Sequence, residues 1–260
     1  MSRLPVLFIG HGSPLTAFED NKYTQGWTSL VNGIKPRAVL CISAHWCTSG
    51  AGVTAMSSPR TIHDFYGFPE HLYQFQYPAP GDPQLARRIA EILAPLNVHQ
   101  DQQWGLDHGC WAVMKHLYPQ ADVPVVQLSI DMNREAHWHH DIGRQLSVLR
   151  DEGVLILGSG NVVHNLRRIQ FPDAAPAYDW AVRFNQQVRQ CIESRDVQPL
   201  IDYQAGDEAL RQAAMLSIPM PDHYFPLLYV LGASDERDAI DVSLDDIVLG
   251  SISMMCVKLG

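Results

Sequence analysis

Short apolar runs alternate with amphipathic stretches along the chain. Runs that are apolar, often β-branched and bounded by glycine, proline or polar residues predict strands at 6–9, 38–43, 123–128, 154–157 and 247–257. Apolar positions three or four residues apart predict helices between them, at 82–93, 109–117, 135–150, 178–194 and 207–215. This alternation is typical of an α/β protein with a central, largely parallel or mixed sheet and helices on both faces. No repeat or flexible linker interrupts it, so we expect a single three-layer domain over residues 1–260.

Two segments depart from this alternation. Residues 57–83, here called the aromatic loop, contain five prolines and six aromatic residues. The prolines make the segment unsuited to a helix, and the aromatic side chains make it too apolar for a linker. Long irregular loops of this kind often cover binding sites, although simple packing on the sheet is the alternative. Residues 169–177 are a shorter loop of the same type.

Composition and charge exclude several classes of protein. With 46% hydrophobic and 18% charged residues, the 260-residue chain is globular rather than disordered. A net charge of −9 lacks the basic field of a non-specific nucleic-acid binder. The apolar runs are far shorter than the roughly 18 residues of a spanning helix, and no signal peptide is apparent, so we expect no membrane association. Five cysteines without a C-x-x-C pair indicate reduced thiols in a cytoplasmic protein.

Three of the twelve histidines follow predicted strands. His11 stands between two glycines after the first strand, His45 follows the second, and His164 follows the fourth through a Gly-Ser-Gly turn. Open α/β sheets bind ligands at the carboxyl ends of their strands, and imidazole is the commonest side-chain ligand of metals. We therefore expect these histidines to converge on a metal centre; a separate structural role for each is the alternative.

Two further histidines stand at predicted helix starts. The N-terminal helix dipole at His108 favours the neutral imidazole, which is the form that acts as a base. His223 opens an apolar, helix-like run. A capping or packing role is the alternative for both. We interpret His137, His139 and His140 as the polar start of a helix. The nucleophile-elbow, dinucleotide-binding, P-loop and H-E-x-x-H motifs are absent from the sequence.

Four motifs built around histidines stand in order along the chain: His11–Pro14, Ser43–Trp46, Asp107–Gly109 with Trp111, and Gly158–Asn165. Together they resemble the class III extradiol ring-cleaving dioxygenases of the protocatechuate-4,5-dioxygenase type, and most closely the 4,5-DOPA dioxygenase branch. The likeness spans nearly the whole chain. It implies one mononuclear non-haem metal ion, with a small catechol and O2 as substrates.

The resemblance also implies roles for individual residues. His11 and His45 become metal ligands, His164 the acid/base residue beside the metal, and His108 a group that orients substrate or relays protons. The wider family uses a late glutamate as third ligand, whereas this sequence offers His223 there. We therefore expect His223 to be the third ligand, with His164 completing a four-histidine set in a resting form. Such a set suits zinc(II) as readily as iron(II), and iron(II) is expected for turnover.

The implied reaction is insertion of O2 into a catechol ring next to the diol, such as 4,5-cleavage of L-DOPA. We expect the aromatic loop to exclude water, and His63, Tyr66 and Phe68 to contact the substrate. Two alternatives remain: a zinc-dependent hydrolase on the same scaffold, with His164 as base, and a non-catalytic binding module. Metal content together with oxygen consumption separates these three readings.

Overall fold

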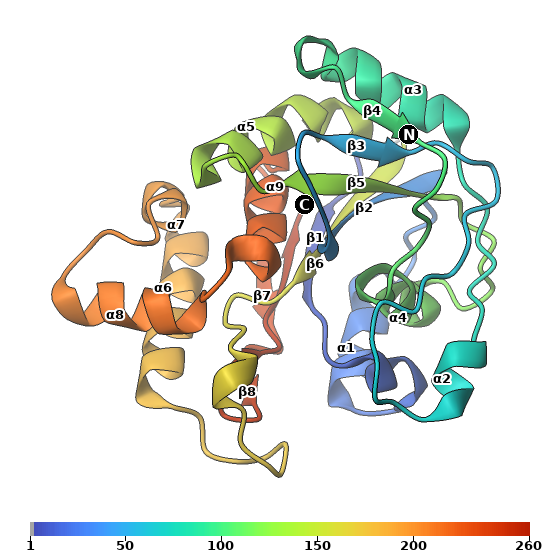
Figure 1. Cartoon of the computed structure of the whole chain (residues 1–260). Coiled ribbons are helices and arrows are strands. Elements are labelled where there is room, and N and C mark those ends of the chain that lie inside the picture. The colour runs from blue at the N-terminus through green and yellow to red at the C-terminus, as the bar shows by residue number, and fades with distance from the viewer. Residues whose placement is uncertain (1–2) are drawn as a thin grey trace.

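The centre of the fold is an eight-stranded mixed sheet (Figure 1). The computed structural model describes residues 3–260. Its strands are β1 (Val6–Gly10), β2 (Ala38–Thr48), β3 (Gly52–Thr54), β4 (His99–Asp101), β5 (Val125–Asp131), β6 (Val154–Gly160), β7 (Ile240–Ser243) and β10 (Cys256–Leu259). They lie in the order β4-β3-β5-β2-β6-β1-β10-β7. The central strands β5, β2, β6 and β1 are parallel, whereas β10 is antiparallel to β1 and β7.

Helices cover both faces of this sheet (Figure 1). One face carries α1 (Lys22–Leu30) and α4 (His108–Leu117). The other carries α3 (Pro83–Ile92), α5 (Ala136–Leu146), α6 (Asp179–Ser194) and α9 (Phe225–Ala233), with α7 (Gln198–Ile201) and α8 (Glu208–Ser217) beside α6. The predicted α/β architecture, with a mixed sheet between two helical layers, is confirmed.

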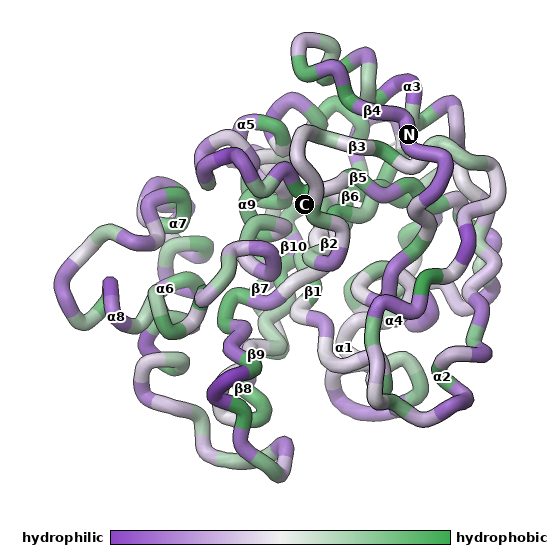
Figure 2. Tube along the Cα trace, viewed as in Figure 1, coloured by the Kyte–Doolittle hydropathy of each residue, from purple (hydrophilic) through white to green (hydrophobic). Residues whose placement is uncertain are grey.

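The two hydrophobic cores follow from the pleat of the strands. In β1, Val6 and Phe8 pack into the core beneath α5 and α9, whereas Leu7 and Ile9 pack into the core beneath α1 and α4. Successive side chains of a strand point to opposite faces, so a continuous apolar run fills both layers. Figure 2 shows the same distribution, with hydrophobic residues along the central strands and α9 and hydrophilic residues on the outer turns.

Helix α9 is buried along its whole length between the sheet and α5. Glycines allow this close packing, because a Cβ at Gly143 would lie 2.2 Å from the Tyr229 carbonyl oxygen and one at Gly232 would lie 2.0 Å from that of His140. The polar interpretation of His139 is wrong: its ring is fully buried, stacks on Phe225 at 4.1 Å and hydrogen-bonds the Tyr229 hydroxyl at 3.0 Å. This packing fixes where α9 begins.

The structure corrects two predicted segments. Residues 247–257 form three short strands, because Leu249 and Gly250 turn the chain with φ angles of 52° and 73°. Strands β8 (Ile247–Val248) and β9 (Ile252–Ser253) pair as a separate hairpin, and only β10 joins the main sheet. The aromatic loop contains a helix after all, α2 (Glu70–Gln74), which occupies the proline-free stretch after Pro69.

Other elements match the prediction with shifted ends or were missed. The helix predicted at 135–150 ends at Leu146 and continues as a 3₁₀ turn, Ser147–Arg150. Helix α1 and the short strands β3, β4 and β7 were not predicted. Among residues 3–260, no helix is both long and apolar enough to cross a bilayer.

Candidate metal centre

Three histidines reach one point from separate parts of the fold. His11 directly follows β1, and His45 lies near the carboxyl end of β2. These two strands are not neighbours, since β6 lies between them and pairs in parallel with both. His223 ends the 3₁₀ turn Pro221–His223 that precedes α9. The carboxyl ends of three parallel strands therefore form the floor of the site.

The backbone of β6 holds His223 over this floor. The backbone N–H of Asn161 donates to the carbonyl oxygen of His223 at 2.9 Å. A Cβ at residue 160 would lie 2.1 Å from the same oxygen, so only glycine permits this approach. The Asn161 side-chain amide also donates to the His11 carbonyl oxygen at 2.7 Å and so ties the two histidine-bearing segments together.

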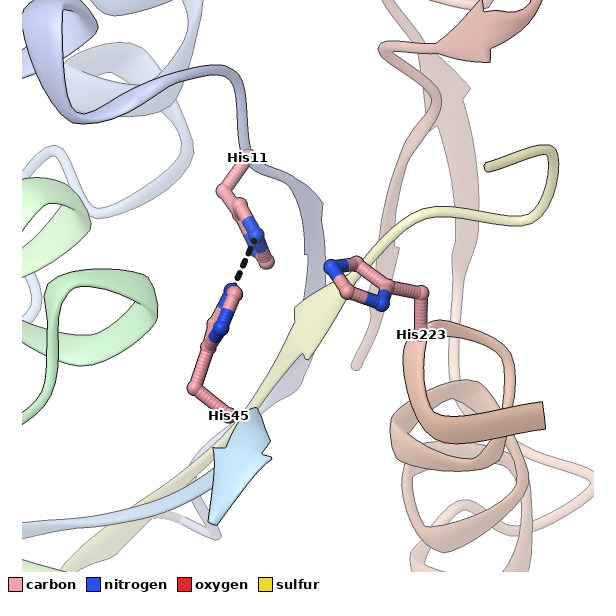
Figure 3. A group of neighbouring side chains, drawn as sticks. All are labelled: His11, His45 and His223. Carbon is pink, nitrogen blue, oxygen red and sulfur yellow. Dashed lines mark hydrogen bonds between the residues drawn. The ribbon is translucent and has the colours of Figure 1, made fainter. Parts of the chain in front are cut away.

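The three imidazoles turn their nitrogens toward a common point (Figure 3). Each of His11, His45 and His223 offers a ring nitrogen, and these atoms all lie within 4.8 Å of one another. The Nε2 atoms of His11 and His45 are 3.1 Å apart. Two nitrogens bound at about 2.0–2.1 Å to one tetrahedral ion lie roughly 3.3 Å apart, so the spacing suits a shared metal ion.

Hydrogen bonds determine which nitrogen of His11 is available. The Ser159 hydroxyl donates to the Gly109 carbonyl oxygen at 2.6 Å and therefore accepts from the His11 Nδ1–H at 3.0 Å. The proton stays on Nδ1, and Nε2 keeps its lone pair toward His45. Ser159 lies within the Gly158–Asn165 motif, but the sequence did not predict its role, because its contact with His11 depends on the pairing of β1 with β6.

Two more predicted histidines lie against this group. The His164 ring stacks on His223 at 3.5 Å, with an angle of 8° between the planes. The His108 ring lies 3.9 Å from that of His45 and 5.8 Å from that of His11. All five histidines assigned to the site are thus brought together. No nitrogen of His164 lies within 4.8 Å of all three others, so His164 stands beside the three-nitrogen group.

The electrostatics keep the imidazoles of His11, His45 and His164 neutral. Burial, and then repulsion from the neighbouring imidazoles, holds the pKa of His11 and of His45 well below the usual histidine value. The same two causes, in the same order, lower the pKa of His164. Neutral imidazoles keep the lone pairs that a metal ion requires, so the donor set fits a divalent metal.

Two aspartates back the histidines, and sequence reasoning missed both. Asp64, in the aromatic loop, has one carboxylate oxygen 2.8 Å from Nδ1 of His108 and 3.3 Å from Nδ1 of His45. Asp222 lies 3.2 Å from Nδ1 of His223. Burial opposes ionisation of each carboxyl group, but contact with its histidine outweighs burial and lowers the pKa of both. The only sequence signal was an acidic residue directly beside a histidine in each case.

The aromatic loop covers the His108 side of the cluster. Phe65 packs edge-on against the His108 ring at 5.7 Å, and Phe68 packs on Phe65 at 5.3 Å. His63 is half-buried, with Nε2 3.0 Å from the Phe75 carbonyl oxygen. Tyr66 is 92% exposed and points to solvent. Phe65, rather than the exposed Tyr66, therefore lies against the site.

Comparison with known proteins agrees with this geometry. The family model described as the catalytic LigB subunit of aromatic ring-opening dioxygenase matches residues 5–246. The chain belongs to the LigB family. The resemblance seen in the sequence is therefore confirmed, and LigB dioxygenases of the extradiol type use a mononuclear metal, as the three-histidine group leads one to expect.

Individual relatives cover almost the whole chain. A protein of Escherichia coli K12 named 4,5-DOPA dioxygenase extradiol is 47% identical over 264 residues, which covers 100% of this chain and 96% of that protein. A Beta vulgaris protein of the same name is 36% identical over 90% of this chain and 88% of its own. The crystal structure of an uncharacterized E. coli K12 protein matches with a TM-score of 0.85 and 43% identity, covering 99% of this chain and 100% of that one. This LigB-family chain is thus a ring-cleaving dioxygenase, and the hydrolase and binding-module alternatives are not supported.

Proposed function

We propose that this LigB-family enzyme cleaves L-DOPA or a closely related catechol next to the diol, at one divalent metal ion. The observation that carries the proposal is the convergence of three imidazoles, His11, His45 and His223, at the carboxyl ends of parallel strands. The names of the E. coli and Beta vulgaris relatives, both 4,5-DOPA dioxygenase extradiol, support this substrate class.

His11, His45 and His223 hold the metal in this proposal. A bound iron(II) ion supplies Lewis acidity toward the catechol oxygens and electron exchange with O2. Zinc(II) fits the same three nitrogens but has no redox chemistry, so iron(II) is the form assigned to turnover. Three protein ligands leave coordination positions for the substrates.

His164 and His108 handle protons in the proposed reaction. His164 is neutral because burial lowers its pKa, so one of its ring nitrogens accepts the proton of a catechol hydroxyl and returns it later in the cycle. His108 has its Nδ1 directed to Asp64, which leaves Nε2 for the substrate. One carbon–carbon bond beside the diol breaks, and both atoms of O2 enter the product. The product is a muconic semialdehyde, so the reaction needs no added reductant.

The aromatic loop supplies the apolar side of the pocket. Phe65 and Phe68 provide ring surfaces near His108, and His63 and Tyr66 belong to the same loop. Such a cover excludes water while the ring opens. We assign catalysis to residues 1–260 as one domain. The five unpaired cysteines support a cytoplasmic location.

Oxygen uptake tests the proposal directly. Protein reconstituted anaerobically with iron(II) is given L-DOPA in an oxygen electrode, with a zinc-loaded sample as control. We expect one O2 consumed per catechol and a yellow ring-opened product with iron only. No uptake with L-DOPA or simpler catechols would refute the assigned reaction.

The His164→Ala variant tests the proton-transfer role. We expect metal content to stay at the wild-type level and kcat to fall by about 10²–10⁴-fold, the usual contribution of a general acid or base. His99→Ala is the matched control, because the His99 side chain is 76% exposed on β4 and far from the cluster in the fold. Normal turnover by His164→Ala would remove this residue from the mechanism.

A further inference from the structure

Asp64 makes contacts that no other residue of the aromatic loop makes with the site. One carboxylate oxygen, Oδ1, accepts the backbone N–H of His108 at 2.8 Å. The other, Oδ2, lies 2.8 Å from the Nδ1 atom of His108 and 3.3 Å from that of His45. The carboxylate thus joins two histidines that stand 63 residues apart in the sequence, 45 and 108.

These contacts determine the proton positions on both rings. An ionised carboxylate only accepts hydrogen bonds, so Nδ1 of His108, which hydrogen-bonds Oδ2, carries the proton. Nδ1 of His45 lies 3.3 Å from the same oxygen, which favours a proton there as well. Both rings then keep the lone pair on Nε2. In His45 that atom lies 3.1 Å from Nε2 of His11, a spacing at which two lone pairs are stable only with a metal ion between them. In His108, Nε2 is the ring nitrogen that does not face Asp64.

We propose that Asp64 is a positioning residue that fixes the Nδ1–H tautomer and the orientation of both His45 and His108. The inference rests on the proposed function for the role of the two histidines. Carboxylates that orient metal-bound imidazoles raise the basicity of the ligand and typically change metal affinity or activity by 10–100-fold. Here one carboxylate serves a metal-binding ring and a substrate-facing ring at once.

A direct role of Asp64 as a metal ligand is less well supported. Asp64, His45 and His108 also offer three atoms within 4.8 Å. However, Oδ2 faces the Nδ1 atoms, on the side of the His45 ring away from the three-nitrogen group, and Oδ1 is engaged by the His108 backbone. A metal ion there would have to displace the His108 N–H groups that both carboxylate oxygens already accept.

The position of Asp64 also links the covering loop to the metal centre. The next residue, Phe65, packs on the His108 ring at 5.7 Å. The loop is held in turn by the Trp111 indole N–H, which donates to the Ile62 carbonyl oxygen at 2.8 Å. Asp64 therefore lies in a loop segment that these contacts hold beside the two imidazoles.

Nitrogen NMR of the wild-type protein gives the first test. Long-range ¹H–¹⁵N spectra of zinc-loaded protein at pH 8 show which ring nitrogen of each histidine carries the proton. We expect His45 and His108 to carry the proton on Nδ1. A proton on Nε2 of either ring would overturn the proposal, and this result does not depend on how any variant folds.

The Asp64→Asn variant gives the second test. An amide keeps one acceptor oxygen where the carboxylate has two, so its N–H₂ group must face either both Nδ1 atoms or the backbone N–H of His108. In the first case the ring tautomers should change, and in the second the backbone hydrogen bond is lost. We expect cobalt(II) and zinc(II) affinity, measured by competition with a chromogenic chelator, to fall by about 10–100-fold. Asp64→Glu, which keeps the carboxylate, should recover part of this loss.

Asp82→Asn is the matched control. Asp82 lies at the end of the same loop and, like Asp64, accepts backbone hydrogen bonds, in its case from the N–H groups of Gln84 and Leu85. It is not among the partners of the clustered histidines. Its metal affinity and tautomers should match the wild type. Unchanged affinity and tautomers in Asp64→Asn, or an Asp64 oxygen bound to cobalt(II) in X-ray absorption spectra, would refute the positioning role. None of these measurements uses turnover, so an inactive wild type would refute the proposed reaction without touching this inference.

Discussion

Acidification should destabilise the metal-free protein steeply. Burial is the leading cause that lowers the pKa of His11, His45 and His164 well below the usual value, and it lowers the pKa of His139 to about 4. In the unfolded chain each of these groups titrates near 6.5. As the pH falls through 6.5, the unfolded chain therefore gains protons that the folded chain does not, and the free energy of unfolding decreases.

The size of the effect follows from the number of buried rings. Between pH 7.5 and 5.5, one histidine that stays neutral in the folded state costs about 1.4 kcal/mol. Four such groups cost about 5 kcal/mol, which is a large part of the roughly 5–15 kcal/mol that stabilises an ordinary domain. His116 and His140, whose pKa values burial also lowers, act in the same direction.

Urea unfolding of chelator-treated protein at the two pH values measures this loss, by linear extrapolation to zero urea. The His164→Ala variant removes one titrating group and should reduce the pH-dependent part by about 1.4 kcal/mol. A total loss below about 1 kcal/mol would refute the reasoning, because it would mean that the buried rings take up protons without unfolding.

Three further changes test the site and its support. His223→Ala leaves two of the three converging imidazoles. Its zinc(II) affinity should fall by more than the roughly 100-fold expected when only a residue that orients a ligand is changed. Undiminished metal content by elemental analysis would place the third ligand elsewhere. Gly109→Ala would put a Cβ 2.6 Å from the Ser43 hydroxyl and 2.8 Å from the His45 ring. The free energy of unfolding should fall by about 1–3 kcal/mol, and metal binding should weaken. A wild-type metal affinity in this variant would contradict the close contact. Asp238→Ala leaves Arg150, which is 1% exposed, without its carboxylate partner at 2.7 Å. The free energy of unfolding, measured in urea, should fall by about 3–5 kcal/mol. A loss below about 1 kcal/mol would show that the backbone carbonyls around Arg150 are enough to stabilise its charge.

The sequence predicted the elements that carry strong local signals. Continuous apolar runs located β1, β2, β5 and β6, and the residues after three of these strands pointed to His11, His45 and His164. Strand order lay beyond such patterns, because it depends on pairing between distant segments. Hence no local pattern indicated that β6 separates the strand that precedes His11 from the strand that carries His45.

The missed features share a physical cause. Strands β3, β4 and β7 have three or four residues each, too few for a periodic pattern. Asp64 contacts His108, 44 positions away, and Ser159 contacts His11, 148 positions away, so the sequence around Asp64 and Ser159 could not identify these partners. His139 is polar in sequence but becomes a core residue because α9 offers it both Phe225 and the Tyr229 hydroxyl.

The pairing of β1 with β10 bears on how the chain is made in the cell. Val6 lies opposite Leu259 in the sheet. The edge of β1 that pairs with β10 therefore has no partner until the ribosome has added 253 more residues. At about 5–20 residues per second, translation takes roughly 13–50 s to supply it. His11 and His45 emerge early in that interval, whereas His223 emerges late. One edge of β1 thus has no strand partner until β10 is made. With the proposed ligand set, the nascent chain would hold all three metal-binding histidines only near the end of synthesis.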